Sequence, residues 1–168
     1  MIAVVNALAK NVLKAEGRFA RVVRGYGHSK RQDAEAVRYH YDVSNAFYAQ
    51  WLDPGMVYSC AYFENGDEDL ATAQIKKIDH ILRKIELRPN QTLLDIGCGW
   101  GALVIRAAQQ YKARCVGVTL SENQFALAKE RVRRAGLEDL VEIRLQDYRD
   151  VRGQFDRITS VGDRKSVV

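Results

Sequence analysis

The sequence lacks any apolar run long enough to cross a membrane. A membrane-spanning helix needs about 18 to 20 apolar residues, and no stretch of this 168-residue chain approaches that length. The N-terminus also lacks the order of a secretory signal, in which a basic segment precedes an apolar one. We therefore expect a cytoplasmic chain. Because 47% of its residues are hydrophobic, it can bury the core of one domain.

Cysteine and histidine are scarce, with three residues of each. Cys60, Cys98 and Cys115 are odd in number and far apart in the sequence, which is typical of reduced thiols rather than of a disulfide framework. None of the histidines stands at a recognised metal-ligand spacing from a cysteine. We therefore expect no metal site.

Charge of one sign is in excess only at the N-terminus. The net charge is +5, and residues 1–31 hold seven basic side chains against one acidic one, so the remainder is nearly neutral. Apolar residues recur between these cations at roughly helical spacing, which predicts a basic amphipathic leader helix. Such a helix either packs on its own domain or lies on an anionic membrane surface. Nucleic-acid binding would rest on this leader alone, and we predict none.

Three glycines on alternate positions, Gly97, Gly99 and Gly101, form the most informative motif. A short apolar run that ends at Asp95 precedes them, and helix-forming residues follow, so we expect a turn from a buried strand into a helix. Glycines there let the backbone approach a ligand, and the helix N-terminus offers free N–H groups to an anion. The dinucleotide fingerprint places its third glycine one residue later, which disfavours a nicotinamide or flavin. A purely structural turn is the alternative.

Periodic patterns predict the remaining elements. An amphipathic helix is expected to begin near Leu70, with Ile75 on its apolar face, Lys77 largely off that face and a stop at residues 88–90. Strands and helices then alternate in the order βαβαββ, with helices over residues 102–110 and 121–136 and later strands over residues 114–118, 141–145 and 155–161. This order indicates a doubly wound α/β sheet with ligands at the carboxyl ends of its strands.

Several motifs together resemble the cyclopropane-fatty-acyl-phospholipid synthase family, which includes the mycolic acid cyclopropane synthases. They are His40-Tyr41-Asp42, Trp51-Leu-Asp-Pro-Gly-Met56, Tyr58-Ser-Cys-Ala-Tyr-Phe63, Leu93 to Gly101, Val116-Gly-Val-Thr-Leu-Ser121 and Leu145-Gln-Asp-Tyr-Arg-Asp150. The resemblance covers about residues 39–162. It implies a Rossmann-like class I fold of the methyltransferases that depend on S-adenosylmethionine (SAM). Residues 1–31 would be the leader, 32–90 a helical and aromatic segment over the cofactor, and 91–162 the first half of the SAM-binding domain.

The resemblance also implies a set of site residues. The residues expected to contact SAM are Tyr58, Ser59, Asp95, Gly97, Cys98, Gly99, Trp100, Gly101, Thr119, Leu120, Ser121, Gln124, Asp147 and Tyr148. Cys60 would lie in the segment that helps to hold a bicarbonate ion, the base of the reaction. The residues alone also allow explanations that involve no cofactor. Ser121 and Gln124 can form a capping box, Tyr58 can belong to the aromatic core, and Cys60 can be a small buried side chain.

The activity that this family implies is the transfer of a methylene group from SAM to the cis double bond of unsaturated phospholipid acyl chains. A peripheral position on the inner membrane face and a homodimer are further expectations. The alternatives are another methyltransferase of the same fold or a SAM-binding remnant without activity. After Gly162 the family continues with Met-Phe-Glu-His or a close variant, whereas residues 163–168 lack a glutamate and a histidine. We therefore expect a sheet that is incomplete at its C-terminus and a chain that is inactive and only marginally stable alone.

Overall fold

A four-stranded parallel sheet forms the centre of the computed structural model, which describes residues 44–162. The strands are β1 (Thr92–Ile96), β2 (Arg114–Thr119), β3 (Val141–Leu145) and β4 (Arg157–Ser160), and their order in the sheet is β3-β2-β1-β4. All three strand pairs are parallel. The chain runs outward from β1 through β2 to β3 and then crosses back to β4, on the other side of β1. This reversal creates a topological switch point at the carboxyl end of β1.

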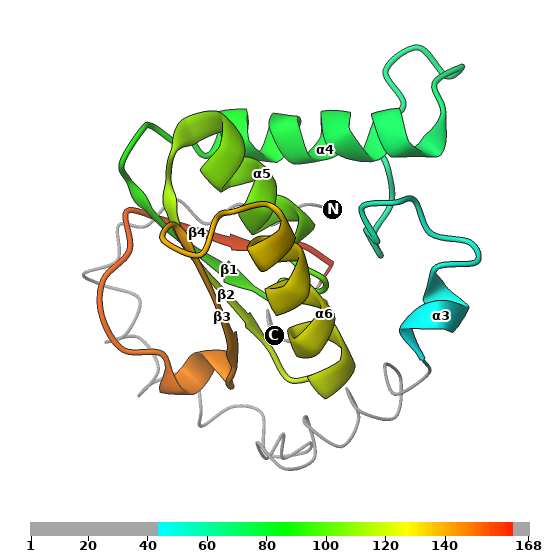
Figure 1. The fold of residues 1–168 in the computed structure, drawn as a ribbon. Helices are drawn as coiled ribbons and strands as arrows, with labels where there is room; N and C mark the ends of the chain where they lie inside the picture. The colour runs from blue at the N-terminus through cyan, green and yellow to red at the C-terminus, as the bar shows by residue number, and fades with distance from the viewer. Residues whose placement is uncertain (1–43, 163–168) are drawn as a thin grey trace, which may run out of the picture.

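Three helices pack around this sheet, α4 (Leu70–Lys84), α5 (Ala102–Tyr111) and α6 (Glu122–Arg134). Figure 1 shows α5 and α6 in front of the strands and α4 alongside α5. A short helix α3 (Asn45–Tyr48) precedes them, and a 3-10 turn η1 (Tyr148–Asp150) connects β3 to β4. The predicted order of strands and helices over residues 92–160 is confirmed.

Local sequence explains where the helices begin and end. Asp69 caps α4 by accepting a hydrogen bond from the Thr72 N–H, and Ser121 caps α6 by accepting one from the Gln124 N–H. At the other end of α6, Gly136 adopts a left-handed φ of 63°, which ends the helix as expected.

Two expectations for α4 are wrong. The helix ends at Lys84, before residues 88–90, because Glu86 turns the backbone into the left-handed region with φ 51°. Ile75 was expected on the apolar face but is 46% exposed, whereas Lys77 was expected off that face but is only 3% exposed. The buried face of α4 is therefore rotated toward Lys77.

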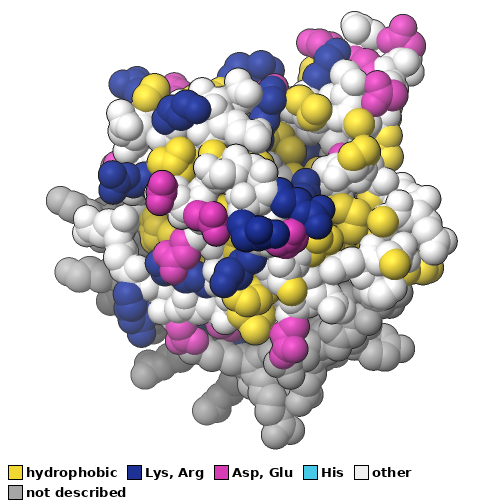
Figure 2. All heavy atoms as spheres, in the orientation of Figure 1, with side chains coloured by type: hydrophobic (Ala, Val, Ile, Leu, Met, Phe, Trp, Pro, Cys, Tyr) yellow, Lys and Arg dark blue, Asp and Glu magenta, His cyan; other side chains and the backbone are white. Residues whose placement is uncertain are grey.

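The core lies between the helices and the sheet. Its strand side includes Leu93, Cys115 and Val141, and its helix side includes Ile81 of α4 and Val104 of α5. Within residues 44–162, no helix is long and apolar enough to cross a membrane. Figure 2 shows basic and acidic side chains interspersed over the helical face rather than gathered into one basic patch.

Candidate functional site at the carboxyl edge of the sheet

The glycine turn follows β1 directly, at the switch point of the sheet. Gly97, Gly99 and Gly101 have φ values of 72°, 55° and 84°, a left-handed conformation that favours glycine. A Cβ atom added at Gly97 or Gly99 would meet no atom within 4 Å, whereas at Gly101 it would lie 3.4 Å from Ala128. The first two glycines therefore border open space that a ligand can enter, and the third packs against α6.

Backbone and side-chain packing hold this turn from below. The N–H groups of Gly97 and Cys98 both donate to the Val118 carbonyl at 3.0 Å. The Cys98 side chain is buried against Gly117, where an added Cβ would lie 2.9 Å from the sulfur. Burial also raises the pKa of the Cys98 thiol. Cys98 is thus a neutral packing residue, whose thiol also donates to the Gly99 carbonyl at 3.7 Å.

Trp100 connects the turn to helix α3. Its ring is 2% exposed and its Nε1 donates to Asn45 Oδ1 at 2.7 Å. Asn45 in turn donates through Nδ2 to the Asn123 carbonyl of α6 at 3.2 Å. Tyr48 packs 5.1 Å from the Trp100 ring centroid. Trp100, which was expected to contact the cofactor, therefore anchors helix α3 to the glycine turn.

Asp95 lies near the end of β1 and is 3% exposed. It accepts a hydrogen bond from the Thr159 hydroxyl of β4 at 2.8 Å. Burial raises the pKa of its carboxyl to about 7, and the bond from Thr159 opposes that rise only in part. Buried acids with raised pKa values are concentrated at functional sites, and this one stands beside the glycine turn.

The end of β2 contributes a compact polar cluster. The Thr119 hydroxyl donates to Gln124 Oε1 at 2.8 Å and accepts from the Ser121 N–H at 3.2 Å. Ser121 and Gln124 are buried and Leu120 is half-buried. Only half of the expected capping box forms, because the Gln124 side chain bonds to Thr119 instead of returning to the Ser121 N–H.

Asp147 and Tyr148 follow β3 at the same edge. The Gln146 N–H donates to the Thr119 carbonyl at 3.0 Å, which brings this loop next to the end of β2. Asp147 caps η1 and pairs with Arg149 at 2.6 Å, and Tyr148 is 37% exposed. The loop therefore presents an aromatic ring beside the polar cluster.

A segment from the N-terminal side closes the edge near β4. A Cβ atom added at Gly162 would lie 3.7 Å from the Ser59 Cβ, so Ser59 sits beside the chain that leaves β4. Tyr58 is 51% exposed, with its ring 5.6 Å from that of buried Tyr48 and 5.4 Å from that of Trp51. Tyr58 is therefore an exposed member of an aromatic cluster, and Cys60 is exposed rather than buried.

Sequence reasoning missed the residues that hold this segment in place. Gln74 donates to the Ser59 carbonyl at 2.9 Å, and Lys77 donates to the Ser59 hydroxyl at 2.5 Å. Arg131 of α6 donates to the carbonyls of Gly55 and Trp100 at 2.7 and 2.9 Å. These side chains act across long sequence separations, and helical periodicity carries no signal for them.

The arrangement suits a polar ligand with an anionic end. Open space borders Gly97 and Gly99, and α5 begins directly after the turn, where unpaired N–H groups favour an anion. The Ser160 hydroxyl, at the carboxyl end of β4, is buried without a hydrogen-bond partner in the described structure. Residues 44–162 contain no cluster of three His, Cys, Asp or Glu side chains that could hold a metal ion.

Comparison with known proteins assigns the chain to a family. The sequence profile described as mycolic acid cyclopropane synthetase matches residues 28–167. The chain belongs to the mycolic acid cyclopropane synthetase family. The α/β fold of the SAM-dependent methyltransferases, expected from the resemblance, is confirmed.

Individual members of the mycolic acid cyclopropane synthetase family support this assignment. The chain is 53% identical over 137 residues to a probable fatty acid methyltransferase of Pseudomonas putida, and 49% identical over 123 residues to the cyclopropane-fatty-acyl-phospholipid synthase of Escherichia coli K12. These matches cover 80% and 73% of the chain but only 35% and 31% of the relatives. A crystal structure of the mycolic acid cyclopropane synthase CmaA1, complexed with SAH and CTAB, is 43% identical with a TM-score of 0.74, and the match covers 77% of the chain and 45% of that structure. The chain thus spans about a third of the length of these curated relatives.

Proposed function

We propose that this chain contributes the SAM-binding part of an enzyme that forms cyclopropane rings on unsaturated acyl chains of membrane phospholipids. The observation that carries the proposal is the pair of left-handed glycines, Gly97 and Gly99, that border open space at the switch point of the sheet. The similarity to CmaA1 complexed with SAH supports SAM as the ligand. The similarity to the Escherichia coli phospholipid synthase supports the acyl substrate.

The residues around the glycine turn divide into two groups that match the two ends of SAM. The glycine turn, Trp100 and the start of α5 would receive the amino-acid part, whose carboxylate favours helix N–H groups. Asp95 would offset the positive charge of its ammonium group. The nucleoside part would lie between the β2 cluster and the loop after β3, which supply Thr119, Leu120, Ser121, Gln124, Asp147 and Tyr148.

SAM would supply an electrophilic methyl group. Attack by the lipid double bond would break the bond from that carbon to sulfur, release SAH and leave a carbocation on the acyl chain. Aromatic faces stabilise a cation without trapping it, and exposed Tyr58 offers one such face, packed on Tyr48, which in turn contacts Trp100 of the glycine turn. Loss of a proton from the transferred carbon then closes the ring. We assign bicarbonate as the base and place it next to Cys60, which is exposed and therefore accessible to an ion.

Methyl transfer to a fatty acid without ring closure is the second candidate function. The name of the Pseudomonas putida relative favours it, since that protein is described as a probable fatty acid methyltransferase. The two reactions share the attack on the methyl group and differ in which carbon loses the proton. Ring closure takes it from the transferred carbon, whereas a methyl branch requires its loss from a neighbouring carbon of the acyl chain. The chemical form of the transferred carbon therefore separates them.

A chimera tests the proposal with a complete catalytic domain. Residues 44–162 would replace the matching segment of the Escherichia coli synthase, and the product would be incubated with ¹³C-methyl SAM and dioleoyl phosphatidylglycerol vesicles. We expect ¹³C in a ring methylene, detected by NMR, with the unmodified synthase as the control. Label in a methyl branch would favour the second function, and a chimera that binds SAH but transfers no label would contradict both.

A further inference from the structure

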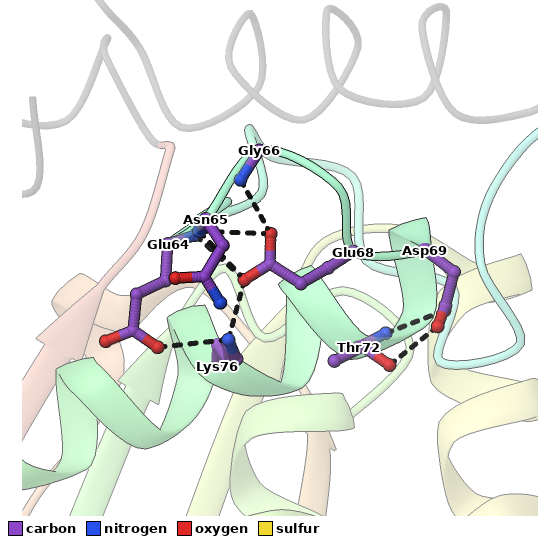
Figure 3. A network of polar contacts seen from close by, with 7 residues as sticks. All are labelled: Glu64, Asn65, Gly66, Glu68, Asp69, Thr72 and Lys76. Atoms are coloured by element: carbon purple, nitrogen blue, oxygen red, sulfur yellow. Dashed lines mark hydrogen bonds and ion pairs between the residues drawn. The ribbon is translucent and has the colours of Figure 1, made fainter.

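Two adjacent lysines on α4 have opposite environments. Lys76 pairs with Glu68 at 2.6 Å and with Glu64 at 3.0 Å in the acidic loop before the helix, as Figure 3 shows. Lys77 points the other way and is 3% exposed. It forms no ion pair in the part of the chain that the structure describes, and both of its hydrogen bonds go to Ser59. A buried ammonium that no carboxylate contacts directly is costly, which indicates a role beyond packing.

Ser59 is held in one orientation by these contacts. Lys77 donates to the Ser59 hydroxyl oxygen at 2.5 Å and to its carbonyl at 3.4 Å, and Gln74 donates to the same carbonyl at 2.9 Å. An ammonium group has donors only, so the hydroxyl oxygen must accept in this bond. The hydroxyl proton is then directed elsewhere, and none of the described residues accepts it.

The position of Ser59 brings this proton to the site. Ser59 lies beside Gly162, just after β4, and β4 pairs with β1, whose end leads into the glycine turn. An anionic group of a ligand on that turn would supply an acceptor for this proton. The positive charge of Lys77 behind Ser59 would strengthen the bond, because charge-assisted hydrogen bonds are the stronger ones.

We propose that Lys77 is a positioning residue for SAM, which fixes Ser59 so that its hydroxyl donates to the carboxylate of the cofactor's amino-acid part. This proposal rests on the function proposed above. Lys77 does not touch the cofactor itself. It acts through Ser59 and adds a positive potential on the carboxylate side of the site.

The protonation state of Lys77 is consistent with this role. Burial lowers its pKa to about 8, although nearby Asp53 and Cys60 act in the opposite direction. The side chain thus remains mainly an ammonium at pH 7. A bound carboxylate would favour the charged form further.

Ligand affinities of variants test the proposal. Dissociation constants would be measured by calorimetry at pH 7 for SAH and for 5′-methylthioadenosine, a nucleoside thioether without the amino-acid part. We expect Lys77→Met and Ser59→Ala each to weaken SAH binding about tenfold and to change 5′-methylthioadenosine binding less than twofold. In the double variant, the loss should be no greater than in Ser59→Ala alone, because Lys77 acts through that hydroxyl.

Lys76→Met is the matched control, since it removes an adjacent lysine whose partners are Glu64 and Glu68, and SAH affinity should stay unchanged. Equal weakening of both ligands by Ser59→Ala, or additive losses in the double variant, would overturn the role of Lys77. Lys77→Gln repeats the test with a side chain that can still donate, should Lys77→Met lose both ligands by unfolding. A wild-type chain that binds neither ligand would instead overturn the proposed function, and this proposal with it.

Discussion

Replacement of Asp95 by asparagine should stabilise the ligand-free protein, and the gain should grow with pH. Burial raises the pKa of the Asp95 carboxyl from 3.8 to about 7. The folded chain therefore holds a proton on Asp95 between about pH 4 and pH 7, where the unfolded chain has released it. A raised pKa in the folded state means that stability is greatest at low pH and is lost as the pH rises to about 7.

The magnitude follows from the size of this shift. Each pKa unit corresponds to about 1.4 kcal/mol, so roughly 2 to 3 kcal/mol of folding free energy is lost between pH 5 and pH 8 through Asp95 alone. Asparagine keeps an oxygen that can accept the hydrogen bond from Thr159 but carries no charge. The difference in free energy of unfolding between Asp95→Asn and the wild type should therefore be larger at pH 8 than at pH 5, by about 2 to 3 kcal/mol.

Urea unfolding at the two pH values, followed by tryptophan fluorescence, measures this difference directly. Asp156→Asn is the control, because hydrogen bonds from Thr92 lower the pKa of Asp156, and this exposed carboxyl stays ionised at both pH values. The difference in free energy of unfolding between Asp156→Asn and the wild type should be the same at pH 5 and pH 8. A stability gap for Asp95→Asn that is constant or that shrinks from pH 5 to pH 8 would refute the reasoning. We also expect Asp95→Asn to bind SAH about tenfold more weakly at pH 8, so that stability and affinity change in opposite directions.

Three further substitutions test the packing around the glycine turn. Gly117→Ala should lower the free energy of unfolding by about 1 to 3 kcal/mol in a urea titration, because its Cβ would lie 2.9 Å from the Cys98 sulfur, and adding Cys98→Ala should restore part of the loss. Asn45→Ala should leave the buried Trp100 Nε1 without a partner, cost about 1 to 3 kcal/mol and shift the tryptophan emission. Arg131→Met should release the Gly55 and Trp100 carbonyls and make the 53–60 segment more susceptible to limited proteolysis, with exposed Arg133→Met as the unaffected control. A stable Gly117→Ala variant, an unchanged emission spectrum or an unchanged cleavage rate would contradict the respective contact.

The sequence predicted the part of the fold that depends on local pattern. The apolar run before Asp95, the alternate glycines and the capping serine at residue 121 each determine their structure over a few residues, and the structure confirms the turn, the strand order and the start of α6. The helix at residues 70–84 shows the limit of such patterns. Lysine has a long apolar stem that can be buried. Lys77 is buried because Ser59, 18 residues away, accepts a hydrogen bond from its ammonium group.

The site is held together by contacts between residues far apart in the sequence, which no local sequence pattern predicts. Asn45 and Trp100 are 55 residues apart, and Arg131 reaches a carbonyl 76 residues away. The family motifs identified Tyr58 and Ser59 as site residues without indicating what holds them. The unpartnered Ser160 hydroxyl likewise becomes visible only when β4 is placed beside β1.

Binding of SAH to the 168-residue chain and to two glycine variants tests the central claim most directly. Gly99→Ala and Gly136→Ala both place a methyl group on a left-handed residue, with φ of 55° and 63°, and in both cases the added carbon meets no atom within 4 Å. Each should lose about 1 to 2 kcal/mol of stability through backbone strain. We predict that the wild type and Gly136→Ala bind SAH equally well in a calorimetric titration and that Gly99→Ala binds at least tenfold more weakly. Equal affinity of all three proteins, or no binding by the wild type, would contradict the assignment of the glycine turn as the cofactor site.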